Sequence, residues 1–306
     1  MVSSANVLNS GLKINRQRIL VAVDVEIIVG DSRKVLGFFP ERTFQCCVTS
    51  PPYWGLRDYG IEGQIGAEPT LERSLEDLVA IFREVRRVLR DDGTLWLNIG
   101  DSYTSGNRGW RDPDKKNPAR GMNYRPPNPT GLKDKELIGI PWRIALALQA
   151  DGWYLRSDVI WYKPNCQPES VKDRPTRSHE YVFLLSKNED YFYDSAGSKE
   201  PTTTRGQLRN RRTVWSINTE ASKEAHFAMF PPSLVKLCMV AGSAAGSKII
   251  DPFFGAGTVG VVARELGRGC VGIELKPEYA EIARKRVASA AVQATLFSRR
   301  SSLESA

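Results

Sequence analysis

Long apolar runs are missing from this sequence of 306 residues. A membrane-spanning helix needs about 20 consecutive apolar residues. The best candidate, residues 19–29, is interrupted by Asp24 and Glu26. The first residues also lack a basic segment followed by an apolar one, which is the pattern of a secretory signal. We therefore expect a cytoplasmic protein with no membrane partner.

Cysteine and histidine are scarce. The cysteines show no C-x-x-C spacing, which argues against a disulfide framework and a zinc site; they are Cys46, Cys47, Cys166, Cys238 and Cys270. The only histidines are His179 and His226, too few to build a metal centre. We expect reduced thiols, as in a cytosol, and no metal.

The composition is that of a globular protein, with 41% apolar and 25% charged residues, but its charge is unevenly distributed. The net charge of +8 is accounted for by two segments, 105–131 and 199–212. Both are rich in Gly, Pro, Asn and Thr, so we expect loops. Basic loops on a near-neutral body favour a polyanionic partner such as nucleic acid, although two solvated surface loops would look the same.

Apolar periodicity predicts strands that alternate with helices. The strand candidates are 19–29, 44–48, 94–99, 158–162, 181–185, 248–250 and 270–273. The first long helix is expected to start at an N-cap on Ser74 and to stop before Asp92–Gly93, and further helices are expected at 141–150, 232–240, 258–266 and 277–287. This alternation is typical of an α/β fold with a mostly parallel, doubly wound sheet.

Residues 248–260 read as a strand, a glycine turn and a helix. Gly255 and Gly257 can take positive φ and let the backbone pass close to a ligand. Glu274 ends the next predicted strand, where a carboxylate can accept hydrogen bonds from both ribose hydroxyls of an adenosine moiety. These features predict a nucleoside-cofactor site, and we expect Gly257→Val to weaken cofactor binding with folding retained.

The glycines alone also fit a dinucleotide fingerprint, Gly255-x-Gly257-x-x-Gly260, or a turn that serves packing. Asp251, just before the turn, favours S-adenosylmethionine, whose sulfonium and ammonium groups suit an acidic neighbour. A nicotinamide fingerprint usually opens its domain, whereas this one lies in the last fifth of the chain.

The segment Ser50-Pro51-Pro52-Tyr53 ends a predicted strand, where open α/β sheets place their chemistry. Two prolines stiffen the turn and remove its N–H donors, so the turn presents acceptors. The Ser50 hydroxyl and the Pro51 carbonyl can accept the hydrogens of a substrate amine, and Tyr53 can offer a flat face to a base. Alone, the turn could also be a strand terminator with Tyr53 in the core.

Together these two turns resemble the β class of S-adenosylmethionine-dependent DNA amino-methyltransferases of bacteria and phages, which methylate cytosine N4 or adenine N6. In that family a catalytic (S/D/N)PP(Y/F/W) motif precedes a cofactor FxGxGT motif, here Phe253 to Thr258. The resemblance runs from about Ile28 to Val287. It implies a Rossmann-like methyltransferase fold in permuted order, with the catalytic half first.

The resemblance implies roles for further residues. Asp31 corresponds to the early acidic cofactor contact, and Phe230 belongs to the segment that holds the methionine end of the cofactor. The full set of expected cofactor residues is Asp31, Phe230, Asp251, Phe253, Gly255, Gly257, Thr258 and Glu274. His179-Glu180 has the composition of an acid–base pair, but the family uses none there, and we expect a structural contact at a strand edge.

The implied organisation is a single catalytic domain over 15–288. It divides into a catalytic half at about 19–190, a target-recognition insert at about 190–225 and a cofactor half at about 226–288, with a flexible tail at 289–306. We expect base reading by 199–220 and phosphate contacts by the first basic loop. The expected DNA-binding residues are Lys115, Lys116, Arg120, Arg209, Arg211, Arg212 and Trp215.

The expected reaction is site-specific methylation of a cytosine N4 in double-stranded DNA, with the base flipped out of the helix. Serine at position 50 resembles the cytosine branch, and adenine N6 is the runner-up. A non-enzymatic DNA-binding protein is the alternative of another class. The expected partners are DNA and a cognate restriction endonuclease, and the protein is expected to be a monomer or a dimer.

Overall fold

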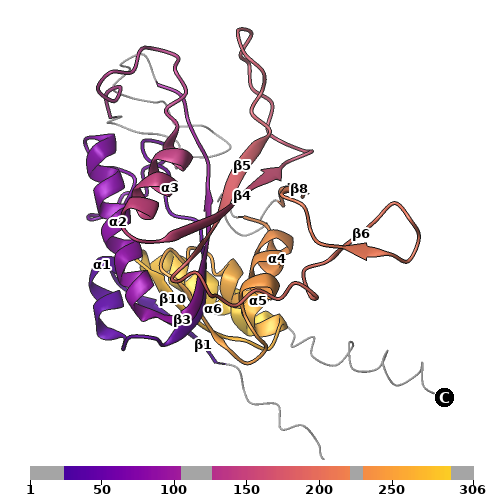
Figure 1. Ribbon diagram of the computed structural model, residues 1–306. Coiled ribbons are helices and arrows are strands. Elements are labelled where there is room, and N and C mark those ends of the chain that lie inside the picture. The colour runs from indigo at the N-terminus through magenta and orange to yellow at the C-terminus, as the bar shows by residue number, and fades with distance from the viewer. Residues whose placement is uncertain (1–23, 105–125, 221–229, 291–306) are drawn as a thin grey trace, which may run out of the picture.

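Eight strands form one sheet in the order β1-β10-β9-β2-β3-β5-β4-β8 (Figure 1). The computed structural model describes residues 24–104, 126–220 and 230–290. The strands are β1 (Val25–Val29), β2 (Phe44–Thr49), β3 (Leu89–Ile99), β4 (Tyr154–Tyr162), β5 (His179–Ser186), β8 (Val214–Ser216), β9 (Lys248–Asp251) and β10 (Gly269–Glu274). A separate hairpin contains β6 (Glu200–Pro201) and β7 (Leu208–Arg209).

The sheet is mostly parallel. From β1 to β3 every neighbouring pair is parallel, β5 runs antiparallel to both β3 and β4, and β8 is parallel to β4. The described helices are α1 (Ser32–Val35), α2 (Leu71–Val88), α3 (Ile140–Ala150), α4 (Pro232–Gly242), α5 (Thr258–Glu265) and α6 (Pro277–Ser289), with a 3₁₀ turn at Leu36–Phe38. The predicted doubly wound α/β fold is confirmed.

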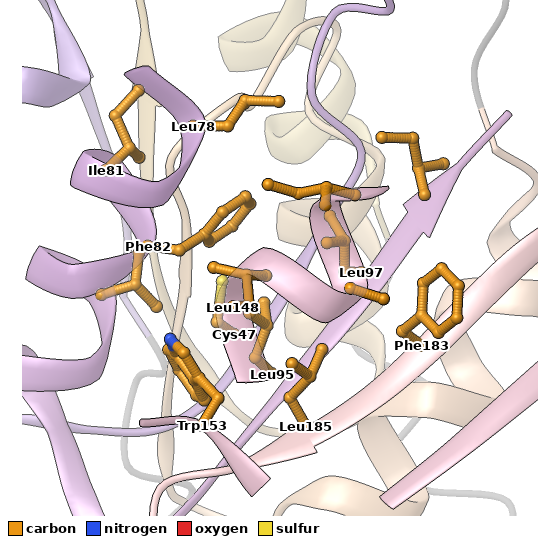
Figure 2. Packing of buried hydrophobic residues seen from close by; sticks show 14 of the residues in the cluster. Cys47, Leu78, Ile81, Phe82, Leu95, Leu97, Leu148, Trp153, Phe183 and Leu185 are labelled. Atoms are coloured by element: carbon orange, nitrogen blue, oxygen red, sulfur yellow. The ribbon is translucent and has the colours of Figure 1, made fainter. Parts of the chain in front are cut away.

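Helices cover both faces of the sheet, with α2 and α3 on one face and α4, α5 and α6 on the other (Figure 1). The alternation of strand side chains explains this: Cys47 belongs to the first core cluster, whereas its neighbour Cys46 belongs to the second. Figure 2 shows Phe82 of α2 and Leu148 of α3 converging on Leu95 of β3. Each such side chain contributes about 1.5–3 kcal/mol of hydrophobic burial.

The strand order reverses between β9 and β2. From β9 the chain proceeds outward through β10, and from β2 it proceeds in the other direction through β3. Such a switch point opens a crevice at the carboxyl ends of the strands, where open α/β sheets bind ligands. The turn after β2 holds Ser50, and the turn after β9 holds Gly255, so the two predicted turns flank this point.

Several predicted boundaries were wrong: β4 begins at Tyr154 and not at residue 158, and α2 and β3 also differ from the prediction. Helix α2 begins at Leu71 because the Thr70 hydroxyl accepts a hydrogen bond from the Arg73 N–H, so Thr70 is the N-cap and the predicted cap, Ser74, is a buried helical residue. Strand β3 begins at Leu89, where it pairs with Phe44 across an irregularity in the ladder. Asp92 and Gly93 therefore lie within β3 and do not mark the end of α2.

Among the described residues, no helix combines the length and the apolarity that crossing a membrane requires.

Candidate active site

The proline turn follows β2 directly, at the carboxyl edge of the sheet. Pro51 is buried, and Ser50 and Tyr53 are half-buried. The Ser50 Oγ and the Tyr53 hydroxyl oxygen lie 3.4 Å apart. The structure thus brings the hydroxyl and the aromatic ring of the predicted motif together at the switch point.

A second strand pair contributes polar groups beside Tyr53. Glu180, at the start of β5, accepts hydrogen bonds from the Tyr53 hydroxyl at 2.8 Å and from the Asn98 amide at 3.1 Å. Lys163, just after β4, forms an ion pair with the same carboxylate. From the sequence we expected only a strand-edge contact at His179–Glu180, whereas Glu180 lies against the proline turn. The antiparallel register of β5 creates this contact, and no sequence motif signals it.

A buried hydrogen bond joins the ends of β2 and β9, the strands that lead into the two turns. The Thr49 hydroxyl donates to the Asp251 carboxylate at 2.6 Å, and the Phe253 N–H donates to the same oxygen at 3.0 Å. Asp251 is only 1% exposed, and burial raises its pKa to about 7, although both hydrogen bonds oppose the rise. The carboxylate thus fixes β9 against β2 directly below the switch point.

The glycine turn is held by the carboxylate of Glu274 at the end of β10. Its two oxygens accept hydrogen bonds from the Gly255 N–H at 2.7 Å and from the Lys276 N–H at 2.8 Å. Burial raises the pKa of Glu274 above its ordinary value, although the backbone hydrogen bonds act to lower it. The Leu275 N–H also bonds this carboxylate, and a carboxylate has about four acceptor positions, so about one position remains open.

The glycines in this turn and in the elements beside it serve different purposes. At Gly255, with φ +52°, an added Cβ would meet nothing within 4 Å, so the backbone there faces open space. At Gly257, with φ +80°, a Cβ would lie 2.8 Å from the Ala283 Cβ of α6. Gly260 and Gly272 make room for the ring of Phe254, with which a Cβ at either position would collide. Of these glycines, only Gly255 leaves space for a ligand.

We therefore expect Gly255→Ala and Gly257→Ala to differ. Gly257→Ala adds a collision with α6 to the strain of a positive φ, and the free energy of unfolding should fall by about 2 kcal/mol or more. Gly255→Ala should cost about 1 kcal/mol but should weaken cofactor affinity, because its methyl group enters the open space. Denaturant melts and titration calorimetry measure the two quantities. Equal stability of the two variants would contradict the different roles given to Gly255 and Gly257. The collision of a Cβ at Gly257 also corrects our expectation that Gly257→Val retains folding.

The remaining predicted cofactor residues are placed as follows. Both carboxylate oxygens of Asp31 accept hydrogen bonds from Arg33; burial raises its pKa, but these bonds outweigh burial and hold it below its ordinary value. Phe253 packs at the edge of the first core cluster and Phe230 at the edge of the second. Thr258 is buried at the start of α5.

Part of the predicted DNA surface lies outside the described residues, namely Lys115, Lys116 and Arg120. In the hairpin segment, Glu200 pairs with three arginines: Arg209 at 2.8 Å, Arg212 at 3.1 Å and Arg211 at 3.8 Å. The segment that carries β6 projects beyond β8 (Figure 1).

Trp215 requires a correction as a DNA contact. It is only 6% exposed and belongs to the second core cluster, and its ring lies 6.1 Å from that of Trp96. The ladder between β4 and β8 turns this side chain toward the sheet's own core, so the ring has no face for DNA.

The connection between β4 and β5 covers residues 163–178. It leaves β4 at Lys163 and enters β5 just before Glu180, so it lies at the same edge of the sheet as the proline turn. Its Asn165 exchanges hydrogen bonds with the backbone of Thr219, at 3.0 and 2.8 Å. Thr219, near the end of the predicted base-reading segment, therefore lies at this edge of the sheet. The three arginines of that segment are bound to Glu200 instead.

A proline turn and a glycine turn flank one switch point, which is where open α/β sheets bind their ligands. The chain belongs to the DNA methylase family, whose model matches residues 44–285. It is 62% identical to the type II methyltransferase M.SmaI of Serratia marcescens, over 86% of this chain and 90% of that protein. It is 57% identical to M.Cfr9I of Citrobacter freundii, over 90% and 91%. The predicted DNA methyltransferase is thereby confirmed.

Solved structures share the fold. A Thermus thermophilus protein assigned as a DNA modification methylase, solved with S-adenosyl-L-methionine, superposes with a TM-score of 0.61 at 27% identity, over 87% of this chain and 93% of that one. The cytosine-N4-specific PvuII DNA methyltransferase superposes with a TM-score of 0.64 at 20% identity, over 86% of each chain, which is a likeness of fold alone. Within the described ranges, no cluster of His, Cys, Asp or Glu has the makings of a metal site.

Proposed function

We propose that this methyltransferase transfers a methyl group from S-adenosyl-L-methionine to the N4 atom of a flipped-out cytosine in double-stranded DNA. The observation that carries the proposal is the position of Ser50: it directly follows Thr49, whose hydroxyl donates a hydrogen bond to Asp251, just before the glycine turn. The turn that presents acceptors to an amine and the turn suited to the methyl donor thus share one crevice.

The cofactor fits the residues on the other side of the switch point. Gly255 faces open space, Glu274 keeps an acceptor position that a ribose hydroxyl would use, and Asp251 places a buried carboxyl group directly before the turn. Asp31, which forms an ion pair with Arg33, would lie beside the adenosine. When bound, S-adenosyl-L-methionine supplies an electrophilic methyl group next to the amine.

Ser50 and Pro51 prepare the nucleophile. The lone pair of an exocyclic amine is delocalised into the base, so the amine is a weak nucleophile. Two acceptors that bond its hydrogens draw the nitrogen toward a tetrahedral shape and localise the lone pair. Positioning and charge complementarity then supply most of the rate, and no covalent enzyme intermediate is needed.

Serine at position 50 favours cytosine over adenine. A neutral hydroxyl accepts a hydrogen bond from N4 without placing a full negative charge near the ring acceptors of cytosine. Adenine N6 has a similar neighbour in N1, so adenine remains the second candidate. In the DNA complex, Tyr53 would lie against the flipped base, and Lys115, Lys116 and Arg120 would contact phosphates, as the sequence predicts.

The raised pKa of Asp251 predicts a pH-dependent cofactor affinity. In the free protein its carboxyl has a pKa of about 7, so it is largely protonated at about pH 6. A cation bound beside it favours the ionised form, so binding releases a proton and affinity rises with pH, by up to about tenfold per unit below the pKa. Calorimetry at about pH 6 and 8, in buffers of different ionisation enthalpy, measures both quantities. Equal affinities, or an unchanged pH dependence in Asp251→Asn, would contradict this placement.

The proposed function is tested with purified protein, plasmid DNA and S-adenosyl-L-methionine carrying a labelled methyl group. The proposal predicts label in the DNA and one recurring modified sequence on long-read sequencing. Unlabelled DNA under conditions where the cofactor binds would overturn it. A cognate endonuclease would cut only the unmodified form of that sequence.

A further inference from the structure

Glu180 is the endpoint of a hydrogen-bond chain that reaches the catalytic serine. Its carboxylate is bonded by groups from three elements: the Tyr53 hydroxyl at 2.8 Å, the Asn98 amide at 3.1 Å, and the Lys163 ammonium. The Glu180 and Lys163 side chains are 18% and 17% exposed, so this is a largely enclosed ion pair. Such a polar cluster is costly to bury unless its groups bond one another. Here they do, which fixes the carboxylate in place.

Glu180 determines which group donates and which accepts at each step of this hydrogen-bond chain. A carboxylate only accepts hydrogen bonds, so the Tyr53 O–H must donate to it. The Tyr53 oxygen is then left as an acceptor, and the hydroxyl 3.4 Å away on Ser50 is positioned to donate to it. With its own hydrogen pointing toward Tyr53, the Ser50 oxygen presents its lone pairs to the crevice. Ser50 is thereby an acceptor for the substrate amine, which is the role that the proposed function requires.

Close packing holds Tyr53 and Glu180 together. At Gly100, which follows β3, an added Cβ would lie 2.7 Å from the Tyr53 ring and 3.2 Å from the Glu180 side chain. Burial and the charge of Glu180 raise the pKa of Tyr53 well above its ordinary value. The phenol therefore keeps its proton at neutral pH and can pass one on only as it receives another. In the resembled family the position of Tyr53 also takes Phe or Trp, which have no hydroxyl group. The resemblance therefore does not imply a hydrogen-bond chain through Tyr53.

We propose that Glu180 is a positioning residue that acts through Tyr53 to hold Ser50 as an acceptor and that it takes up the proton released by methyl transfer. The proposal rests on the proposed function, because it needs Ser50 beside the amine. It extends the reacting groups from the proline turn to β5 and β4, with Lys163 compensating the charge of the carboxylate.

The proposed methyl and proton transfers conserve atoms and charge. The amine nitrogen uses its lone pair to form the bond to the methyl carbon, and the electron pair of the broken S–C bond stays on sulfur. The nitrogen becomes positive and gives a proton to Ser50 Oγ, as the Ser50 proton moves to the Tyr53 oxygen and the Tyr53 proton moves to Glu180. The positive charge of the sulfonium and the negative charge of Glu180 are both lost. The carboxyl returns its proton to water after the product leaves.

Glu180→Gln and Tyr53→Phe test the chain. Gln can still accept a hydrogen bond from Tyr53 but cannot take up the proton, and Phe keeps the ring but removes the relay oxygen. Each variant should slow single-turnover methyl transfer about 100-fold, with affinities for S-adenosyl-L-methionine and target DNA within about twofold of the parent. Because both act in one chain, the double variant should be no slower than about 100-fold. The control Glu84→Gln, which loses an ion pair with Arg87 on α2, should match the parent.

Three results would overturn the proposal: a parental rate in either single variant, a multiplied effect of about 10⁴-fold in the double variant, or reduced affinities with an unchanged rate at saturation. Tyr53→Phe carries the test on its own if Glu180→Gln does not fold. Ser50→Ala separates this inference from the proposed function. A slow Ser50→Ala beside a parental Glu180→Gln refutes the chain alone, whereas a parental Ser50→Ala refutes the proposed function.

Discussion

Ser50→Ala should slow methyl transfer by about 10²–10³-fold while leaving the protein folded and able to bind its cofactor. Removing one well-placed hydrogen-bonding group from a preorganised site typically costs that much. The Pro51 carbonyl remains, so a residual rate is expected. Ser50 is half-buried, and within the described structure its hydroxyl is bonded to Tyr53 alone, so little folding energy depends on it. Single-turnover transfer of a labelled methyl group to DNA measures the rate.

The matched control is Ser195→Ala, which alters an exposed serine in the segment after β5. It should transfer methyl groups at the parental rate. If Ser50→Ala kept that rate as well, the hydroxyl would have no part in preparing the amine. A loss of cofactor affinity in Ser50→Ala with an unchanged rate at saturation would place the serine on the donor side of the crevice instead.

Glu274→Ala should reduce the affinity for S-adenosyl-L-methionine by about 100-fold or more. The substitution removes the proposed ribose acceptor and also leaves the Gly255 and Lys276 N–H groups without their carboxylate partner. Each lost hydrogen bond to a charged group is worth about 1.5–3 kcal/mol. The glycine turn should loosen, so the melting temperature should fall too, which goes beyond the loss of a ligand contact that the sequence alone predicted.

Calorimetry measures the affinity, and Glu278→Gln in the exposed first turn of α6 is the control for charge near the site. Glu274→Gln separates the two effects, because its amide oxygen still accepts one backbone hydrogen bond. We expect it to keep most of the stability and to bind the cofactor more weakly than the parent. Parental affinity in both variants would remove Glu274 from the cofactor site.

The order of strands and helices was predictable because burial in a parallel sheet imprints a strong pattern. Strands β2 and β10 are short, buried and mostly apolar. Helix α5 begins at Thr258, directly after the glycine turn. The helix boundary was less predictable, because Thr70 and Ser74 are both good caps by composition. Only the hydrogen bond that Arg73 donates to Thr70 decides between them.

The two turns of the site were predictable because each is a contiguous motif whose residue types restrict the backbone. The contact of Glu180 with Tyr53 lay beyond sequence reasoning, because it arises only through the pairing of β5 with β3 and β4. The prediction that Trp215 contacts DNA was wrong. An aromatic residue among arginines suggests a DNA surface, but the register of β8 against β4 buries the ring. The division into catalytic half, recognition insert and cofactor half stays a prediction.

Nucleoside analysis by mass spectrometry tests the central claim most directly. DNA isolated from cells that express the protein, and from cells that express Ser50→Ala, is digested to nucleosides and separated. Our account predicts N4-methylcytosine in the first sample and a greatly reduced amount in the second. N6-methyladenine as the sole methylated product would contradict the assignment of the base, and the absence of both would contradict the proposed function.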